Sequence, residues 1–206
     1  MKKTLTLLGS AFLLAGATGA FATSTTDLTV TGIITPVACT PSLSNGGLVH
    51  NGKISAGDLN PAWSTLVGTH PLQLTVACNA PARFALDPID NRAGTQTVSS
   101  WFGLGLTDDG EKLGYVRVAV KNALADGQPA RAIESDDGGA TWDRALATGP
   151  GYLLSVGSAT DFSVPIAVED VTMDFEVQIY IARADSLTLT GEVVMDGSVT
   201  FEMKYL

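Results

Sequence analysis

Residues 171–181 read VTMDFEVQIYI, and this stretch decides the fold class. All its odd-numbered residues are apolar, and each even-numbered residue carries a polar group. Strict alternation with a period of two is typical of a β-strand that buries one face and exposes the other. The stretch therefore predicts a long, half-buried strand and an all-β fold.

The same period recurs on both sides of that stretch. Apolar side chains alternate within 72–78, where Cys78 ends the buried face, and again within 116–120. Turn-forming clusters separate the strands. These clusters are Asn45-Gly46-Gly47, Asn51-Gly52, Asp108-Asp109-Gly110, Asp136-Asp137-Gly138-Gly139 and Gly149-Pro150-Gly151. Short strands separated in this way predict an antiparallel β-sandwich. Residues 122–151 alternate less and are predicted to form a long hairpin or a decorated loop, and His50 and His70 are predicted to lie in loops.

The N-terminus is typical of a secretory signal peptide. Lys2 and Lys3 precede an apolar run that is too short and too rich in small residues for a membrane span, and Ala20-Phe21-Ala22 fits the small-x-small cleavage pattern. We expect cleavage after Ala22, so that the mature chain begins at Thr23. Cleavage after Ala20 and an uncleaved anchor are the alternatives.

Two cysteines, Cys39 and Cys78, remain after cleavage and would enter a compartment that oxidises thiols. A single disulfide is the simplest prediction, with both residues pointing inward from the first two strands. The chain has 12 Lys and Arg against 21 Asp and Glu. This acidic balance argues against a nucleic-acid partner, because nucleic-acid phosphates attract basic proteins.

One stretch matches a catalogued motif, the Asp-box of sialidases and related propellers. Ser135-Asp136-Asp137-Gly138-Gly139-Ala140-Thr141-Trp142 fits the pattern Ser-x-Asp-x-Gly-x-Thr-Trp. A propeller needs several blades of about 40 residues each, and the chain carries one such box. We therefore expect a structural hairpin in which Ser and Asp side chains satisfy backbone groups, without sialidase activity.

Other catalytic and metal-binding signatures are absent from the sequence. The acidic pairs Asp108/Asp109 and Asp136/Asp137 lack the EF-hand spacing, so solvated turns are favoured over a calcium site. The chain has no Gly-x-Ser-x-Gly, His-Glu-x-x-His or P-loop motif. The sequence thus predicts neither an enzyme nor a bound cofactor or metal.

The two ends of the mature chain carry the remaining information. Residues 26–39 read TDLTVTGIITPVAC, an extended segment that leads to the first cysteine. Residues 197–206 read GSVTFEMKYL and alternate to the end of the chain, with apolar or aromatic side chains on one face. Each could be an ordinary terminal strand.

Taken in order, these features resemble the major pilin subunits of the chaperone–usher pathway, and most closely the beta-fimbriae major subunit family. The resemblance rests on the signal peptide, the short extension, the segment 32–39 that leads to the first cysteine, and the spacing of Cys39 and Cys78. It also rests on a terminal strand in which Tyr205 is the last residue but one. It implies an immunoglobulin-like antiparallel β-sandwich that lacks its last strand. A donor strand from a neighbour then completes that sandwich.

The resemblance also implies partners and roles. The chain would comprise a signal peptide (1–22), a donor-strand extension (23–31) and a pilin domain (32–206). A periplasmic chaperone would complete the fold first, and at the outer-membrane usher the next subunit's extension would replace it. Leu28 and Val30 would be the donor side chains. The groove-edge strand that meets the chaperone would present four side chains, Val199, Phe201, Met203 and Tyr205.

The function implied is that of a structural subunit in a surface fimbria, which supports adhesion or biofilm formation. The subunit would form a homopolymer outside the cell and could meet a host or surface receptor. The alternative is a self-contained secreted carbohydrate-binding or adhesin domain, in which Trp63, Trp101 and Trp142 are available to stack on sugars. A periplasmic hydrolase is a third class.

Overall fold

The computed structural model describes residues 28–32 and 37–206. The chain divides into two units, Met1–Ile34 and Thr35–Leu206. The predicted signal peptide and residues 23–27 of the predicted extension lie outside the described residues, so both stay predictions. None of the helices in the described part is long and apolar enough to cross a membrane.

Within the described part of the second unit, eleven strands are connected by turns and three short 3-10 segments. The strands are β1 (Cys39–Leu43), β2 (Thr65–Ala82), β3 (Phe84–Asp90), β4 (Phe102–Gly103), β5 (Gly114–Ala125), β6 (Gln128–Ser135), β7 (Asp143–Arg144), β8 (Ala147–Thr148), β9 (Leu153–Ser158), β10 (Val168–Ile181) and β11 (Val199–Tyr205). The 3-10 segments are η1 (Ser44–Gly47), η2 (Ala56–Asp58) and η3 (Ala184–Ser186). The prediction of an all-β fold is confirmed.

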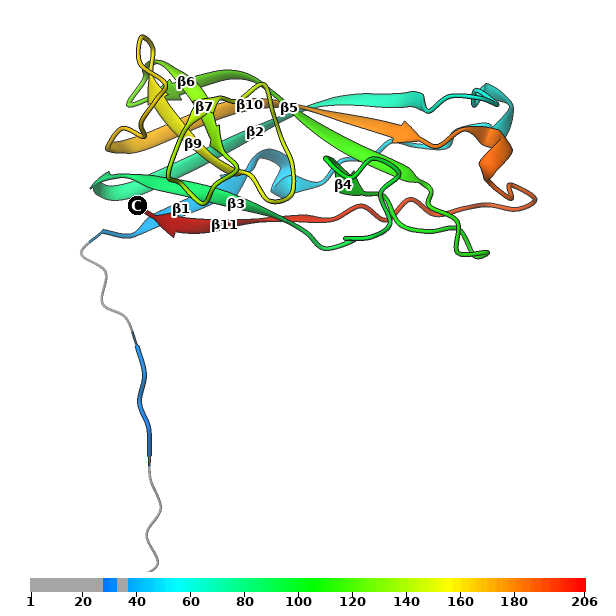
Figure 1. Cartoon of the computed structure of the whole chain (residues 1–206), viewed down its shortest axis with the longest axis horizontal. Coiled ribbons are helices and arrows are strands. Elements are labelled where there is room, and N and C mark those ends of the chain that lie inside the picture. Colours follow the sequence, from blue (N-terminus) through cyan, green and yellow to red (C-terminus); the bar gives the residue numbers. More distant parts are fainter. Residues whose placement is uncertain (1–27, 33–36) are drawn as a thin grey trace, which may run out of the picture. The chain divides into compact units, whose positions relative to one another are not determined.

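The strands form one hydrogen-bonded sheet in the order β1-β2-β10-β5-β6-β9-β3-β11, with β4, β7 and β8 paired at its sides. Every paired strand is antiparallel to its partner. The sheet curls until its first and last strands approach each other, and β1 and β11 run alongside each other in Figure 1. The result is a nearly closed, barrel-like arrangement.

The strand pairing is sparse where the sheet changes direction. Strands β5 and β6 pair over three positions beside the turn at Asp126 and Gly127 and then separate. Strands β3 and β9 share one pair, Leu86 with Leu154. The separation frees β6 to pair with β9 over 130–135, while β5 pairs with β10 along nearly its whole length. The sequence predicted an antiparallel β-sandwich; the structure confirms the antiparallel all-β fold and links the strands into one continuous sheet.

The alternation in 171–181 is confirmed, because every odd-numbered side chain of this stretch is buried and every even-numbered one is half-exposed. Strand β10 is paired on both edges, by β2 and by β5. Its inward side chains meet those of β2 in the main core, where Leu74, Val76 and Met173 are at most 1% exposed. The central strands thus form the floor on which the candidate site is built.

Two local predictions need correction. His70 lies inside β2 and not in a loop, because β2 continues through Pro71 to pair with β10. The register of β1 on β2 starts only at Leu74, so Pro71 lies where one edge of β2 has no β1 partner, a position compatible with proline. Residues 122–151, predicted to form a long hairpin or a decorated loop, contain hairpin turns, but their first half also supplies β6, a strand of the continuous sheet.

Candidate functional site

The two ends of the sheet order leave two strand edges without a backbone partner in the described part of the chain. Strand β1 pairs only with β2, and β11 pairs only with β3. A groove of about 610 Å³ lies between the segments that adjoin these edges, residues 47–52 after β1 and residues 193–198 before β11. Unpaired strand edges expose rows of N–H and C=O groups, so β1 and β11 present backbone donors and acceptors next to the groove.

The floor of the groove consists of side chains from the main core. Val116 and Val118 of β5 and Phe175 and Val177 of β10 line it. In a closed sandwich, a further strand would cover such side chains. Val118, Phe175 and Val177 are at most 7% exposed and Val116 is half-buried, so the groove lies over a floor that is itself largely buried.

The first wall consists of β1 and the segment after it. Strand β1 ends at Leu43 because Asn45, Gly46 and Gly47 all have positive φ, between 53° and 76°, a region that glycine and asparagine tolerate best. The chain then runs along the groove from residues 47 to 52. His70 Nε2 lies 2.7 Å from Asn51 Oδ1, and this contact holds the segment against β2.

The second wall consists of β11 and the segment that precedes it. Residues 193–195 and 197–199 and Phe201 line the groove. The Glu111 carboxylate accepts hydrogen bonds from Thr188 N at 2.7 Å and Thr188 Oγ1 at 2.8 Å. The backbone bond from Thr188 is the main reason why the pKa of Glu111 is lowered from its ordinary value. Near the other end of this segment, the Arg92 guanidinium is ion-paired with Asp196.

A second hollow of about 530 Å³ continues the groove and shares residues 193–195 with it. Lys53 on one side and Glu192 on the other form an exposed ion pair at 2.7 Å. Exposed pairs of this kind contribute little stability and are screened by salt. Large apolar side chains remain exposed on both walls, with Leu48 61% exposed and Val194 78% exposed. The contact between the two walls at this end is therefore weak.

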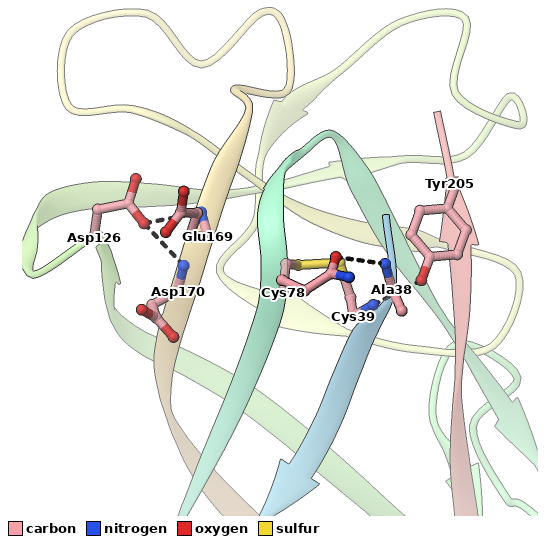
Figure 2. Close-up of a disulfide and its surroundings, with 8 residues drawn as sticks. Ala38, Cys39, Cys78, Asp126, Glu169, Asp170 and Tyr205 are labelled. Atoms are coloured by element: carbon pink, nitrogen blue, oxygen red, sulfur yellow. Dashed lines mark hydrogen bonds between the residues drawn. A yellow bond between two sulfur atoms is a disulfide. The ribbon is translucent and has the colours of Figure 1, made fainter. Parts of the chain in front are cut away.

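At the opposite end, β1 and β11 are joined by one hydrogen bond. Cys39 N donates to Tyr205 Oη at 2.8 Å. Figure 2 shows the Tyr205 ring beside the start of β1, next to the disulfide. Tyr205 thus links the two strands beyond the residues that line the groove.

The predicted disulfide is present. Cys39 and Cys78 are directly opposite each other in the β1–β2 register and are joined (Figure 2). Both are half-buried and pack against the main core. Asn79 Oδ1 accepts a hydrogen bond from Ala38 N at 2.9 Å, which adds a second tie at the same place. These contacts fix the start of the strand that forms the first wall.

The structure also places the four side chains predicted for the terminal strand. Val199, Phe201 and Met203 are half-buried against the main core, and the Phe201 ring stacks on Phe175 with ring centroids 5.9 Å apart. Val199 and Phe201 line the groove, whereas Tyr205 is 45% exposed and makes the contact with Cys39. Their proposed contact with a chaperone stays a prediction.

The predicted donor side chains belong to the other unit of the chain. Residues 28–32 have no regular secondary structure, and Leu28 and Val30 are 90% and 85% exposed. Residues 33–36 lie outside the described residues. The structure therefore gives these two side chains no buried partner, and their role stays a prediction.

The Asp-box stretch forms a hairpin whose polar groups satisfy one another. Asp137 Oδ1 accepts hydrogen bonds from Ser135 Oγ, Ala140 N and Thr141 N at 2.7, 3.0 and 2.9 Å, and Oδ2 accepts one from Thr141 Oγ1 at 2.6 Å. The bonds from Thr141 above all lower the pKa of Asp137 well below its usual range. Trp142 Nε1 donates to Gly139 O at 3.1 Å. The carboxylate is therefore fully used in holding the hairpin together.

In the described part of the chain, no three His, Cys, Asp or Glu side chains lie close enough together to hold a metal ion.

The groove wall between residues 47 and 59 was not predicted from sequence. Its only sequence signal was the pair of turn clusters at 45–47 and 51–52.

Comparison with known proteins identifies a family. The sequence profile of a family described as "protein of unknown function (DUF1120)" matches residues 28–101. The chain is 30% identical to Protein GltF of Escherichia coli (strain K12) over 254 aligned positions, which cover 100% of this chain and 99% of that protein. It is 25% identical to the Uncharacterized protein YhcF of the same organism, with 98% of each chain covered.

The chain therefore belongs to the same family as Protein GltF. Neither name states an activity, a ligand or a partner. The profile match includes Leu28, Val30, both cysteines and the first groove wall. The fimbrial resemblance stays a hypothesis, to be argued from the groove.

Proposed function

We propose that the chain is a structural subunit of a surface fimbria that is assembled by the chaperone–usher pathway through donor-strand exchange. The observation that carries this proposal is the apolar groove beside the unpaired edges of β1 and β11. A strand inserted there would pair with one or both edges and cover exposed apolar side chains of the walls, such as Leu48 and Val194. Addition of a donor strand to an incomplete pilin is a known form of β-strand recognition.

The finer fold proposal is an incomplete immunoglobulin-like sandwich. Strands β2, β10 and β5 would form one layer, and β6, β9, β3 and β11 would form the other, with the sparse β5–β6 pairing at the crossover between them. The missing strand would lie between β1 and β11 and would complete the second layer. This arrangement accounts for the barrel-like appearance, because the open seam lies between the two layers.

The donor would be the extension that precedes β1. Leu28 and Val30 are two residues apart and so lie on one face of an extended strand. Each is almost fully exposed, and full burial of such a side chain is worth about 1.5–3 kcal/mol. An isolated strand is not stable in water, so this segment gains most from a partner that supplies an edge and a groove.

The assembly order follows from the open groove. A subunit with an open apolar groove needs cover as soon as it folds, and a periplasmic chaperone would provide a strand while meeting the free edge of β11. At the outer-membrane usher, the extension of the next subunit would replace that strand. The disulfide supports export to an oxidising compartment, and the filament would then support adhesion or biofilm formation at the cell surface.

The experiment that tests the proposal places a charge in the predicted donor. Val30→Arg would bring an unpaired charge into an apolar groove, which is costly enough to block insertion. We expect it to accumulate as a chaperone-bound monomer with few surface filaments, counted by electron microscopy. Thr29→Arg is the matched control, because residue 29 lies on the opposite face of the strand and should assemble nearly normally.

The chaperone supplies its own strand, so folding on the chaperone should survive in both variants. Retention of the Cys39–Cys78 disulfide, read by mass spectrometry of unreduced peptides, confirms that folding. Normal filament numbers from Val30→Arg would refute the donor assignment and favour the self-contained binding domain.

A further inference from the structure

A third hollow, separate from the groove and from the hollow that continues it, lies on the other face of β5. Val116 and Val118 point into the groove, so Arg117 between them points to the opposite face. There it lines a hollow of about 230 Å³ together with Trp101, Glu134 and Tyr152. A strand that filled the groove would leave this hollow open, because the sheet itself lies between them.

The walls of the hollow combine aromatic surface with charge. The Arg117 guanidinium lies over the Trp101 ring, with Cζ 5.2 Å from the ring centroid. This cation–π contact holds the indole and the guanidinium together. Tyr152 adds a second half-exposed ring, and Leu146, which is 59% exposed, adds an aliphatic edge. Rings of this kind offer both an apolar face and a polar rim.

The two charged groups retain unused hydrogen-bonding capacity. A guanidinium has five N–H donors, and the one side-chain bond found for Arg117 in the described part of the chain is that from Nη1 to Gln178 Oε1, at 2.9 Å. No described residue donates a hydrogen bond to the Glu134 carboxylate. The pKa of Glu134 is raised mainly by burial, and the nearby charges of Asp143 and Asp136 raise it further. A hydrogen-bond donor and an acceptor, each with unused hydrogen-bonding capacity, therefore lie in one hollow with aromatic walls.

These features select a class of ligand. Neighbouring hydroxyl groups can donate to Glu134 and accept from Arg117, while the aliphatic face of a sugar ring can lie on Trp101. The hollow is smaller than the roughly 300 Å³ at the low end of pockets for drug-sized molecules, which suits a single ring. The carboxylate and the overall charge of −9 disfavour anionic ligands.

We propose that the hollow formed by Trp101, Arg117, Glu134 and Tyr152 binds one neutral pyranose ring of a glycan. The proposal does not depend on donor-strand exchange. If the chain does form filaments, each subunit contributes one such site, and weak single sites add up to strong attachment by multivalency. The site would then give the filament its adhesive property without a separate receptor-binding domain.

The test uses the full exported chain in the assembly in which it is isolated. Methyl glycosides of mannose, galactose and glucose are titrated separately and followed by saturation-transfer NMR and tryptophan fluorescence. We expect saturable binding of at least one glycoside. Trp101→Leu should weaken that binding by at least tenfold, and Glu134→Gln should weaken it severalfold through loss of a charged acceptor.

Trp63→Leu is the matched control, because Trp63 is 73% exposed and does not line the hollow. Its variant should bind with unchanged affinity and thus show that an exposed indole alone does not account for the signal. Absence of saturable binding for all three glycosides would overturn the proposal. Binding that is equally strong in the wild type, Trp101→Leu and Glu134→Gln would also overturn it. Neither result would bear on filament assembly.

Discussion

The groove and the Asp-box hairpin differ in how completely they satisfy their own groups. In the hairpin, the Asp137 carboxylate accepts four hydrogen bonds from within the same turn. Around the groove, two strand edges have no backbone partner in the described chain, and apolar wall side chains such as Leu48 and Val194 are exposed. A region that is complete in itself is a structural element, whereas a region that lacks a partner indicates where binding takes place. The conspicuous sequence motif is thus the less informative of the two.

The largest expected effect comes from the disulfide that joins β1 to β2. Replacing both Cys39 and Cys78 with serine frees the start of β1 from β2. Loss of a native disulfide from a small exported domain costs about 2–5 kcal/mol, and the first groove wall depends on β1. We expect guanidinium unfolding of the double variant to show a loss in this range. A change below about 0.5 kcal/mol, within the range of ordinary surface substitutions, would show that β1 is held mainly by other contacts.

A smaller effect is expected from the second wall. Phe201→Ala removes a half-buried ring that stacks on Phe175. Truncating a fully buried Phe to Ala costs about 3–5 kcal/mol of unfolding free energy, so a loss of about 2 kcal/mol is expected for this half-buried ring. Glu202→Ala, one position away on the exposed face, should change the unfolding free energy by less than about 0.5 kcal/mol. Equal effects at the two positions would mean that β11 does not present one face to the groove.

A third prediction concerns the single hydrogen bond that joins the two edges. Tyr205→Phe removes the hydroxyl that accepts from Cys39 N but keeps the ring. One neutral hydrogen bond contributes about 0.5–1.5 kcal/mol, and the partial exposure of Tyr205 places the expected loss near the lower bound. The Cys39 amide should also exchange its proton faster, as measured by hydrogen exchange. Unchanged exchange would show that this bond does not link the two strands.

The hairpin should have the smallest effect on assembly. Asp137→Asn is expected to leave filament numbers unchanged, and the wild-type chain should not hydrolyse a fluorogenic sialoside. The pKa of Asp137 is lowered in the folded state, so its contribution to stability is present above its ordinary pKa near 4 and is lost as the pH falls toward the folded value. Thermal melts below about pH 4 should therefore fall more steeply with pH in the wild type than in Asp137→Asn. Parallel curves, or sialoside turnover, would contradict the structural role.

Sequence patterns predicted the fold class because alternation reports burial directly. Residues 171–181 and 72–78 carry this signal, and the structure buries the faces that they predict. The position of Pro71 suggested a loop at His70, yet β2 runs through both, since cross-strand pairing with β10 outweighs the local preference. Which strands pair at long range is not encoded in local periodicity, so the continuous sheet could not be foreseen.

The candidate site was only half predictable for the same reason. The alternation at the C-terminus identified Val199 and Phe201, but the opposite wall is an irregular segment after β1 without periodicity. The hollow on the other face of β5 joins Trp101, Arg117 and Glu134 from three separate parts of the chain. No local motif connects them, and only the folded sheet brings them together.

The assembly state of the wild-type chain tests the central claim most directly. The proposed function requires the groove to take a strand from another subunit, so the purified protein should run as a ladder of oligomers in mild detergent without heating. Heating should then collapse the ladder to one band, because no covalent bond joins the subunits. A stable, folded monomer that never forms a ladder would contradict the account, since its groove would need no partner.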